Sequence, residues 1–470
     1  MRVSRSSVLL PVSAALALAL SACGGPASAG PAPATRTLSS PTAAGAAGPS
    51  SPAAFPAVAW PMYHGDTART GAESGMPAAG QLAIGWNAHL DGAVYGQPLI
   101  VGSLVIAATE NDTVYALDLA GRVRWRTHVG TPVPLADLPC GNIDPLGITG
   151  TPVYDPADGL VYAVAETAGY HHVLFGFSTT DGSVRVERDI PAPDGQPRYD
   201  QQRAALTIEG GRIYVAFGGL DGDCGPYRGS VVAVPASGSG PLLSYVVPTA
   251  REGGIWATGG PVIGPDGTLY VGVGNGAASA PPFDHSDSVT ALSPLLSRVA
   301  EFAPSTWADD NANDLDLGSM SPAVLKDGTI LAVGKRGTGY LLRASQLGGV
   351  GGQVAQAPVC RAFGGTAVSG STVYVPCEGG GLSAVDVAGG QLRVLWHGPS
   401  SAAGSPVVGG GAVWVADWES SVLYELDPAT GSTRHEIGLG SALPHFASPS
   451  LAGGLIFVGT AEGVVAVRGA

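Results

Sequence analysis

The sequence predicts an all-β fold, namely an eight-bladed β-propeller made of four-stranded antiparallel blades. A short phrase recurs eight times: a small residue and Pro, a strand, a Gly turn, a Val- and Tyr-rich strand, another turn, and a strand that ends near Asp. Apolar residues alternate with period two inside each copy, which indicates short strands. The chain also has 71 Gly and 38 Pro among 470 residues and lacks charged helix-forming stretches. Repeats of four strands at this spacing are typical of propeller blades.

The copies follow one another through most of the chain. Clear copies begin at Gly96 ("GQPLIVGSLVIAATENDTVYALD"), Gly150, Gly259, Met320, Gly404 and Ala447, and weaker copies begin near Ala204 and Gly365. Several copies add a fourth strand that ends in Trp, as in "RVRW" at Trp125 and "QLRVLW" at Trp396.

The two ends of the repeat region complement each other. The last copy stops after "VVAVR" and lacks a fourth strand, whereas an extra strand, "QLAIGW", ends at Trp86 before the first copy. We expect this strand to complete the last blade and close the ring, because closure removes exposed sheet edges that invite aggregation.

The N-terminus has the features of an export signal. Arg2 and Arg5 precede an uncharged apolar run, Val8 to Leu20, which is too short for a comfortable membrane span. The run ends in "LSAC", which resembles the lipobox of bacterial lipoproteins. This resemblance implies a signal peptide of residues 1–22, a lipid on Cys23 and attachment to a membrane surface without spanning it. The alternative is an ordinary signal peptide with a chance cysteine.

Residues 23–59 predict a tether. After the cysteine they are almost wholly Gly, Ala, Pro, Ser and Thr, and Arg36 is the only charged residue. Such a stretch has no periodic apolar face to bury, so we expect it to stay extended and disordered. The predicted folded domain therefore spans residues 60–470.

Charge and cysteine content narrow the possible functions. The formal net charge of −14 would repel nucleic acid, so we expect no nucleic-acid partner. With one cysteine lipidated, an even number remains, which suggests two disulfides in an extracytoplasmic protein. Cys360 and Cys377 flank one predicted hairpin, so we expect them to pair, and Cys140 to pair with Cys224 by elimination. Four cysteines nevertheless allow three connectivities.

Several segments resemble one family. The entry phrase "WPMYHGDTARTG" (60–71), the "VYALD" strand endings and the terminal tryptophans are similar to the pyrroloquinoline quinone (PQQ) type propeller. That family includes quinoprotein alcohol dehydrogenases and also non-enzymatic lipoproteins of outer-membrane protein assembly. The resemblance covers residues 60–470, and it specifies the fold better than the function.

The middle of the chain is similar to the dehydrogenases in more detail. Trp256 matches the tryptophan on which the PQQ ring stacks, and Asn275 in "GVGNG" matches a calcium ligand one hairpin later. Asp316 in "NDLDLGSMSP" falls at the catalytic aspartate, and Lys335 falls at the basic residue that touches the quinone. Asp223, offset by one residue, is the nearest match to an acidic calcium ligand. The resemblance implies that calcium, held by hard oxygens, polarises the quinone while the aspartate takes the substrate proton.

Each matched residue also has a structural alternative. Asp and Asn beside Gly are common turn residues, Asp316 could bond loop amides, and Trp256 could pack between blades. Lys335 with Arg336 could be a solvated pair on an exposed turn. The sequence also departs from the dehydrogenases, because it has no adjacent cysteine pair to cover the quinone and no fused haem domain.

Two functions therefore stay open. The first is a binding propeller: a lipid-anchored, extracytoplasmic, monomeric scaffold that holds an envelope protein, a glycan or a small molecule. The second is a calcium- and PQQ-dependent dehydrogenase that oxidises an alcohol or a sugar. The missing cysteine pair favours the first, and the order of the residues matched to the cofactor site favours the second.

Overall fold

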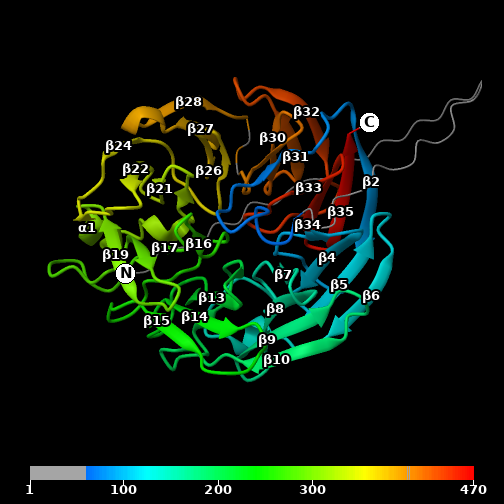
Figure 1. The fold of residues 1–470 in the computed structure, drawn as a ribbon, viewed down its shortest axis with the longest axis horizontal. Coiled ribbons are helices and arrows are strands. Elements are labelled where there is room, and N and C mark those ends of the chain that lie inside the picture. Colours follow the sequence, from blue (N-terminus) through cyan, green and yellow to red (C-terminus); the bar gives the residue numbers. More distant parts are fainter. Residues whose placement is uncertain (1–59, 400, 402, 470) are drawn as a thin grey trace, which may run out of the picture. The chain divides into compact units, whose positions relative to one another are not determined.

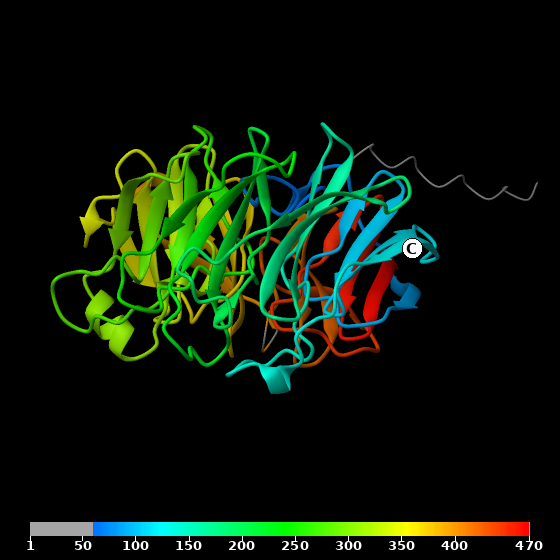
Figure 2. The same ribbon diagram turned by 90° about the horizontal axis from the view of Figure 1, so that it is seen from below.

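The computed structural model describes residues 60–399, 401 and 403–469. The predicted signal peptide, the lipidation site at Cys23 and the predicted tether lie outside these residues. In the described part, the strands form eight sheets that follow one another around a ring in chain order (Figure 1). The prediction of an eight-bladed β-propeller is therefore confirmed. Figure 2 shows the same ring from its side, with the strands running between its two faces.

Each blade runs from an inner strand near the ring axis to an outer strand at the rim (Figure 1). The first four blades contain β3 (Leu99–Val101), β4 (Leu104–Thr109), β5 (Thr113–Asp118) and β6 (Val123–His128); β7 (Val153–Asp155), β8 (Leu160–Thr167), β9 (His171–Ser178) and β10 (Val184–Asp189); β12 (Thr207–Glu209), β13 (Arg212–Gly219), β14 (Ser230–Pro235) and β15 (Leu243–Val246); and β16 (Val262–Ile263), β17 (Leu269–Val273), β18 (Ser288–Leu292) and β19 (Arg298–Ala303). Two short strands extend these sheets, namely β11 (Asp200–Gln201) beside β13 and β23 (Gly349–Val350) parallel to β19.

The other four blades repeat the pattern. They contain β20 (Ala323–Val324), β21 (Thr329–Val333), β22 (Thr338–Arg343) and β24 (Ala355–Pro358); β25 (Ala367–Ser369), β26 (Thr372–Cys377), β27 (Gly381–Asp386) and β28 (Arg393–His397); β29 (Val407–Gly409), β30 (Ala412–Asp417), β31 (Val422–Leu426) and β32 (Thr433–Gly438); and β33 (Ser450–Ala452), β34 (Leu455–Thr460), β35 (Gly463–Gly469) and β2 (Leu82–His89). A short strand, β1 (Ala72–Glu73), lies parallel to β29 in blade 7.

Blade 8 is completed from the start of the domain. Strand β2 pairs antiparallel with β35, and Ile84 lies opposite Val467. The predicted closure of the ring by the "QLAIGW" strand is confirmed. Because the outer strand of the last blade comes from the opposite end of the domain, the ring is fastened by a full ladder of backbone hydrogen bonds.

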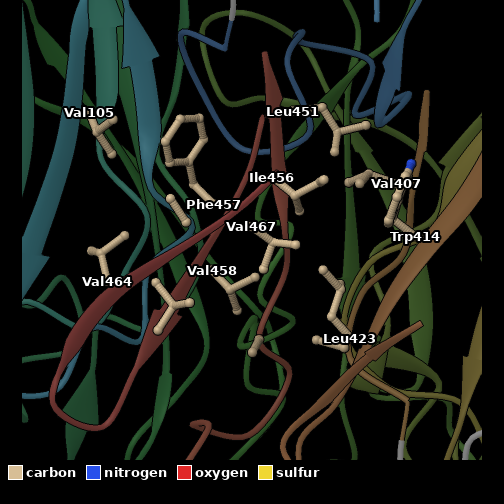
Figure 3. Packing of buried hydrophobic residues seen from close by; sticks show 14 of the residues in the cluster. Val105, Val407, Trp414, Leu423, Leu451, Ile456, Phe457, Val458, Val464 and Val467 are labelled. Carbon is tan, nitrogen blue, oxygen red and sulfur yellow. The ribbon is translucent and has the colours of Figure 1, made fainter. Parts of the chain in front are cut away.

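The core lies between neighbouring blades. The second and third strands of the blades are buried along nearly their whole length, because both faces of each sheet are covered, whereas the outer strand β6 alternates between exposed and half-buried residues. Figure 3 shows this packing around blade 8, where Phe457 faces Val105 of blade 1 and Ile456 faces Val407 of blade 7. Successive side chains of one strand thus join two different interfaces.

Terminal tryptophans connect each of three blades to the next. The indole N–H of Trp125 donates to the carbonyl of Thr179 at 3.0 Å, and its ring covers Gly182 in the turn of blade 2. Gly182 has φ of 72°, and a Cβ there would lie 2.5 Å from the indole. Trp86 and Trp396 donate in the same way to the blades that follow them. Glycine at this turn is required by both the backbone angle and the contact.

An entry segment, Trp60–Glu73, lies across the inner strands of the ring. Its backbone forms hydrogen bonds with the inner strands of blades 1, 2, 4, 6 and 7. His64, which is fully buried, contacts the Ser448 hydroxyl at 2.9 Å, and Arg69 donates to the carbonyl of Leu206 at 2.9 Å. Burial lowers the pKa of His64 to about 3, so the imidazole is neutral. The entry segment therefore connects, through hydrogen bonds, blades that are far apart in the sequence.

Helical structure is confined to short turns in the described residues. These are η1 (Leu135–Asp137), α1 (Trp307–Ala312), η2 (Leu317–Ser319) and η3 (Ala388–Gly390). None of the helices in this part of the chain has the length and apolar character needed to cross a bilayer.

Candidate functional site

A cavity of about 270 Å³ lies where loops from most of the blades converge. Its lining includes four large aromatic side chains, Trp256, Phe363, Trp418 and Phe446, each of which is partly exposed. Charged side chains of both signs complete the lining. The cavity therefore combines apolar ring faces with polar groups, which is typical of small-molecule sites.

The direction of the strands in the blades explains which residues line the cavity. Lys335, Glu378 and Trp418 follow the second strand of their blades by one or two residues, and all three line the cavity. Second strands run in the same direction in every blade, so the residues after them reach the same face of the ring. The outer strands run in that direction too, and the segments that follow them bring Trp256 and Asp316 to the same place.

The structure brings four of the five sequence-predicted residues to the cavity wall. Trp256, Asp316, Lys335 and Asp223 line it. Asn275 stands directly behind the wall, where its backbone N–H donates to the Asp316 carboxylate. Their proposed roles with a cofactor stay predictions, but their proximity to one another is a feature of the fold.

Asp316 is the centre of a dense polar cluster. Its carboxylate lies 2.7 Å from the Lys335 ammonium, which also contacts Asp314 at 2.6 Å. The side-chain amide of Asn275 faces the same carboxylate and donates to it through its nitrogen, since the opposite orientation would set two oxygens against each other. The ammonium also lies 5.7 Å from the centre of the Trp256 ring, within cation–π distance.

Burial and charge pairing oppose each other in this cluster. Burial raises the pKa of Asp316, although Lys335 and the Asn275 N–H act in the opposite direction. Burial lowers the pKa of Lys335, but the carboxylates of Asp316 and Asp314 outweigh it and the pKa is raised. The lysine is therefore charged at neutral pH, and its charge opposes the rise in the pKa of Asp316 that burial causes.

The oxygens of this cluster do not fit a calcium ion well. The Asp316 carboxylate already accepts from Lys335 and Asn275. Asp223 Oδ1 accepts the Tyr227 hydroxyl at 2.5 Å. Calcium needs six to eight oxygen ligands, and in the described residues no group of three or more His, Cys, Asp or Glu side chains is arranged to hold a metal. The carboxylate oxygens of Asp316 and Asp223 instead accept hydrogen bonds from neighbouring side chains and backbone of the protein itself.

Two disulfides brace the loops around the cavity. Cys140 is bonded to Cys224 and Cys360 to Cys377, so the expected connectivity is confirmed. The first ties the segment between blades 1 and 2 to the loop that carries Asp223. The second joins the segment before β25 to the end of β26. Covalent bracing of both loops limits the movement of the cavity wall.

Sequence reasoning missed several lining residues. Arg203, Phe363 and Phe446 each stand four positions before the inner strand of their blade, as do Tyr95 and Thr258. All five border either the large cavity or a second one of about 10 Å³ that adjoins it. The repeat itself contained this signal, because the same position of different copies points towards the axis. Tyr95, Thr258 and Phe446 stand three residues before the Pro of their phrase.

Comparison with protein families agrees with this architecture. The family described as outer membrane protein assembly factor BamB, which consists of PQQ-type repeats, matches residues 79–281 and 297–470. The chain belongs to this family. No curated protein matches the sequence.

Solved structures of alcohol dehydrogenases and of BamB share the fold. Quinohemoprotein alcohol dehydrogenase ADHIIG from Pseudomonas putida HK5 superposes with a TM-score of 0.67 at 14% identity, over 87% of this chain and 80% of that chain. A europium-containing methanol dehydrogenase gives 0.63 at 15% identity, over 86% and 91%. BamB from Moraxella catarrhalis gives 0.58 at 15% identity, over 83% and 100%. At these identities the likeness establishes the fold alone, so the function must be argued from the cavity.

Proposed function

We propose that this family member is a binding propeller that captures a small ligand in its central cavity. The observation that carries the proposal is the convergence of partly exposed aromatic side chains from separate interblade segments on one cavity. Trp256 lies 6.3 Å from Phe363 and 6.4 Å from Phe446, measured between ring centres. Exposed aromatic faces cost free energy in water, and a bound ligand recovers it.

We further propose that the protein works outside the cytoplasm, attached to the membrane through a lipid on Cys23. The apolar N-terminal run and the "LSAC" sequence support this location. The two disulfides agree with it, because such bonds persist in oxidising compartments. The family description adds an envelope protein as the alternative occupant of the cavity face.

A second candidate is oxidation of an alcohol or a sugar with PQQ and calcium. The proximity of Trp256, Asp316 and Lys335 around one cavity supports it. The engaged oxygens of Asp316 and Asp223 count against the calcium site. Binding without chemistry needs only the cavity and is therefore the preferred proposal.

A thermal-shift screen tests the proposal. The mature protein is melted with neutral sugars, aromatic acids, amino acids and nucleotides, and with PQQ in the presence and absence of calcium. We expect at least one class to raise the melting temperature of the wild type but not of Phe446→Leu, which removes one cavity ring. Phe283→Leu is the matched control, because Phe283 is also half-buried but contacts Trp307 away from the cavity.

The outcomes separate the candidates. A shift that persists in Phe446→Leu would locate binding elsewhere and overturn the proposal, as would the absence of any shift. Reduction of an artificial dye by the protein loaded with calcium and PQQ, in the presence of an alcohol or a sugar, would favour the second candidate.

A further inference from the structure

Arg203 is a cation without a salt-bridge or hydrogen-bond partner at the wall of the central cavity. It stands between β11 and β12 and borders both the large cavity and the small one beside it. Among the described residues it forms no ion pair and donates no hydrogen bond, and its Nε is buried without a partner. A guanidinium group carries five N–H donors and stays charged at neutral pH. Leaving such a group unpaired costs free energy unless a ligand supplies an acceptor.

The other cations of the cavity are already neutralised. Lys335 is paired with Asp316 and Asp314, and Arg361 lies 2.7 Å from Glu378. Their charges are therefore committed within the protein. Of the lysine and arginine side chains that line the cavity, Arg203 is therefore the one without a salt bridge, although the charges of Glu110 and Asp221 act on it from a greater distance.

The surroundings of Arg203 are flat and apolar. Its guanidinium carbon lies 4.8 Å from the centre of the Phe446 ring. Phe446 is stacked with Phe363, with ring centres 5.8 Å apart and planes 13° apart. Trp256 lies against both rings. The cavity wall therefore places aromatic ring faces next to the N–H donors of the Arg203 guanidinium. This arrangement matches a flat molecule that carries an anionic group at one end.

We propose that Arg203 anchors an anionic group of the ligand, a carboxylate or a phosphate, while Phe446 and Phe363 hold the flat apolar body of the same molecule. This inference rests on the proposed function and narrows its ligand class to flat organic anions. It involves no chemical step, since ion pairing, hydrogen bonding and ring contact are sufficient for recognition.

Three matched probes test the inference by isothermal titration calorimetry: naphthoate, naphthyl phosphate and neutral naphthamide. We expect the wild type to bind one of the anions on the order of tenfold more tightly than the amide, as is typical of a charge-assisted pair. The preferred anion identifies the group as carboxylate or phosphate. Arg203→Met should abolish the preference, and Arg203→Lys, which keeps the charge but loses the fork, should retain part of it.

Arg212→Met is the matched control. Arg212 on β13 also has a buried nitrogen without a partner but does not line the cavity, so its loss should leave the preference intact. Circular dichroism of each variant without ligand verifies folding, and Arg203→Lys replaces Arg203→Met if the latter unfolds. Equal binding of amide and anions, or a preference that survives loss of Arg203, would overturn the inference. If no probe binds but another compound gives a shift that Phe446→Leu removes, the inference fails while the proposed function stands.

Discussion

The ammonium group of Lys335 lies 2.7 Å from the carboxylate of Asp316 and 5.7 Å from the centre of the Trp256 ring. These residues come from blade 5 and from the segments that lead into blades 5 and 4. The ion pair is nearly enclosed, since the side chains are 11% and 3% exposed. It both neutralises a buried charge and shapes one wall of the cavity.

Replacing Lys335 should destabilise the fold. Lys335→Met leaves Asp316 buried without its cation, and breaking a buried pair in this way costs about 3 kcal/mol. The free energy of unfolding is measured by guanidinium denaturation. Lys326→Met is the control, because Lys326 is the other lysine of the chain and is exposed. The double variant with Asp316→Asn should recover part of the loss, and equal stability of the two lysine variants would show that the pair contributes nothing.

Gly182 should not tolerate a side chain. Gly182→Ala places a Cβ 2.5 Å from the Trp125 indole at a φ of 72°, so we expect a loss of about 1–3 kcal/mol beyond the backbone penalty. Gly159→Ala isolates that penalty, because Gly159 has φ of 74° and no atom near the position of a Cβ. Melting temperatures of the two variants provide the comparison. Equal losses would mean that the tryptophan contact is not tightly packed.

Stability should fall with rising pH through Glu110. Burial raises the pKa of Glu110 to about 8, with the charge of Glu166 adding to it and Gly147 N–H, Thr149 and Arg203 opposing it. An unfolded glutamate ionises near its ordinary pKa of 4.5, so between these values the unfolded state releases a proton that the folded state retains. The contribution of this group is therefore fully present below pH 4.5 and is lost as pH rises to about 8, by at most about 1.4 kcal/mol per pH unit.

Glu110→Gln tests this sign. The amide cannot ionise, so the wild type should lose stability relative to the variant between pH 5 and 8, as measured by denaturant midpoints at each pH. Asp112, whose pKa burial also raises to about 8, is present in both proteins and cancels to first order. A constant difference across this range would contradict a protonated Glu110.

The two disulfides should contribute unequally. Cys140 and Cys224 are 84 positions apart, and Cys360 and Cys377 are 17 apart. Because a longer closed loop restricts the unfolded chain more, their paired Ser variants should lose roughly 4.5 and 3 kcal/mol respectively. Urea denaturation of both double variants gives the ranking. A larger loss for the shorter loop would point to local packing rather than loop closure.

Local patterns were enough to predict the blades. Strands such as β4 and β5 alternate apolar residues between tight turns. The number of copies of the repeated sequence phrase predicted the number of blades. The closing strand at Trp86 was predictable from the two ends of the repeat region. The last copy lacks a fourth strand, and an extra strand precedes the first copy. The cysteine pairing followed from the position of Cys360 and Cys377 around one hairpin.

The chemistry of the cavity was only partly predictable. Trp256, Asp316 and Lys335 were recognised because each lies in a segment similar to a known family. Their ion pairing, which occupies the oxygens that calcium would need, depends on side-chain orientation. Arg203 and Phe446 lie 243 positions apart in the chain and belong to no motif that joins them.

The sequence by itself determined the ring of eight blades, its closure and its bracing, because strand period, turn residues and repeat length act over short stretches of chain. Only the tertiary structure decided which side chains meet at the axis and which charges are left without a partner. The physical reason is that closure of the ring brings the same position of most blades to one small space, where pairing depends on distance and burial rather than on sequence neighbours.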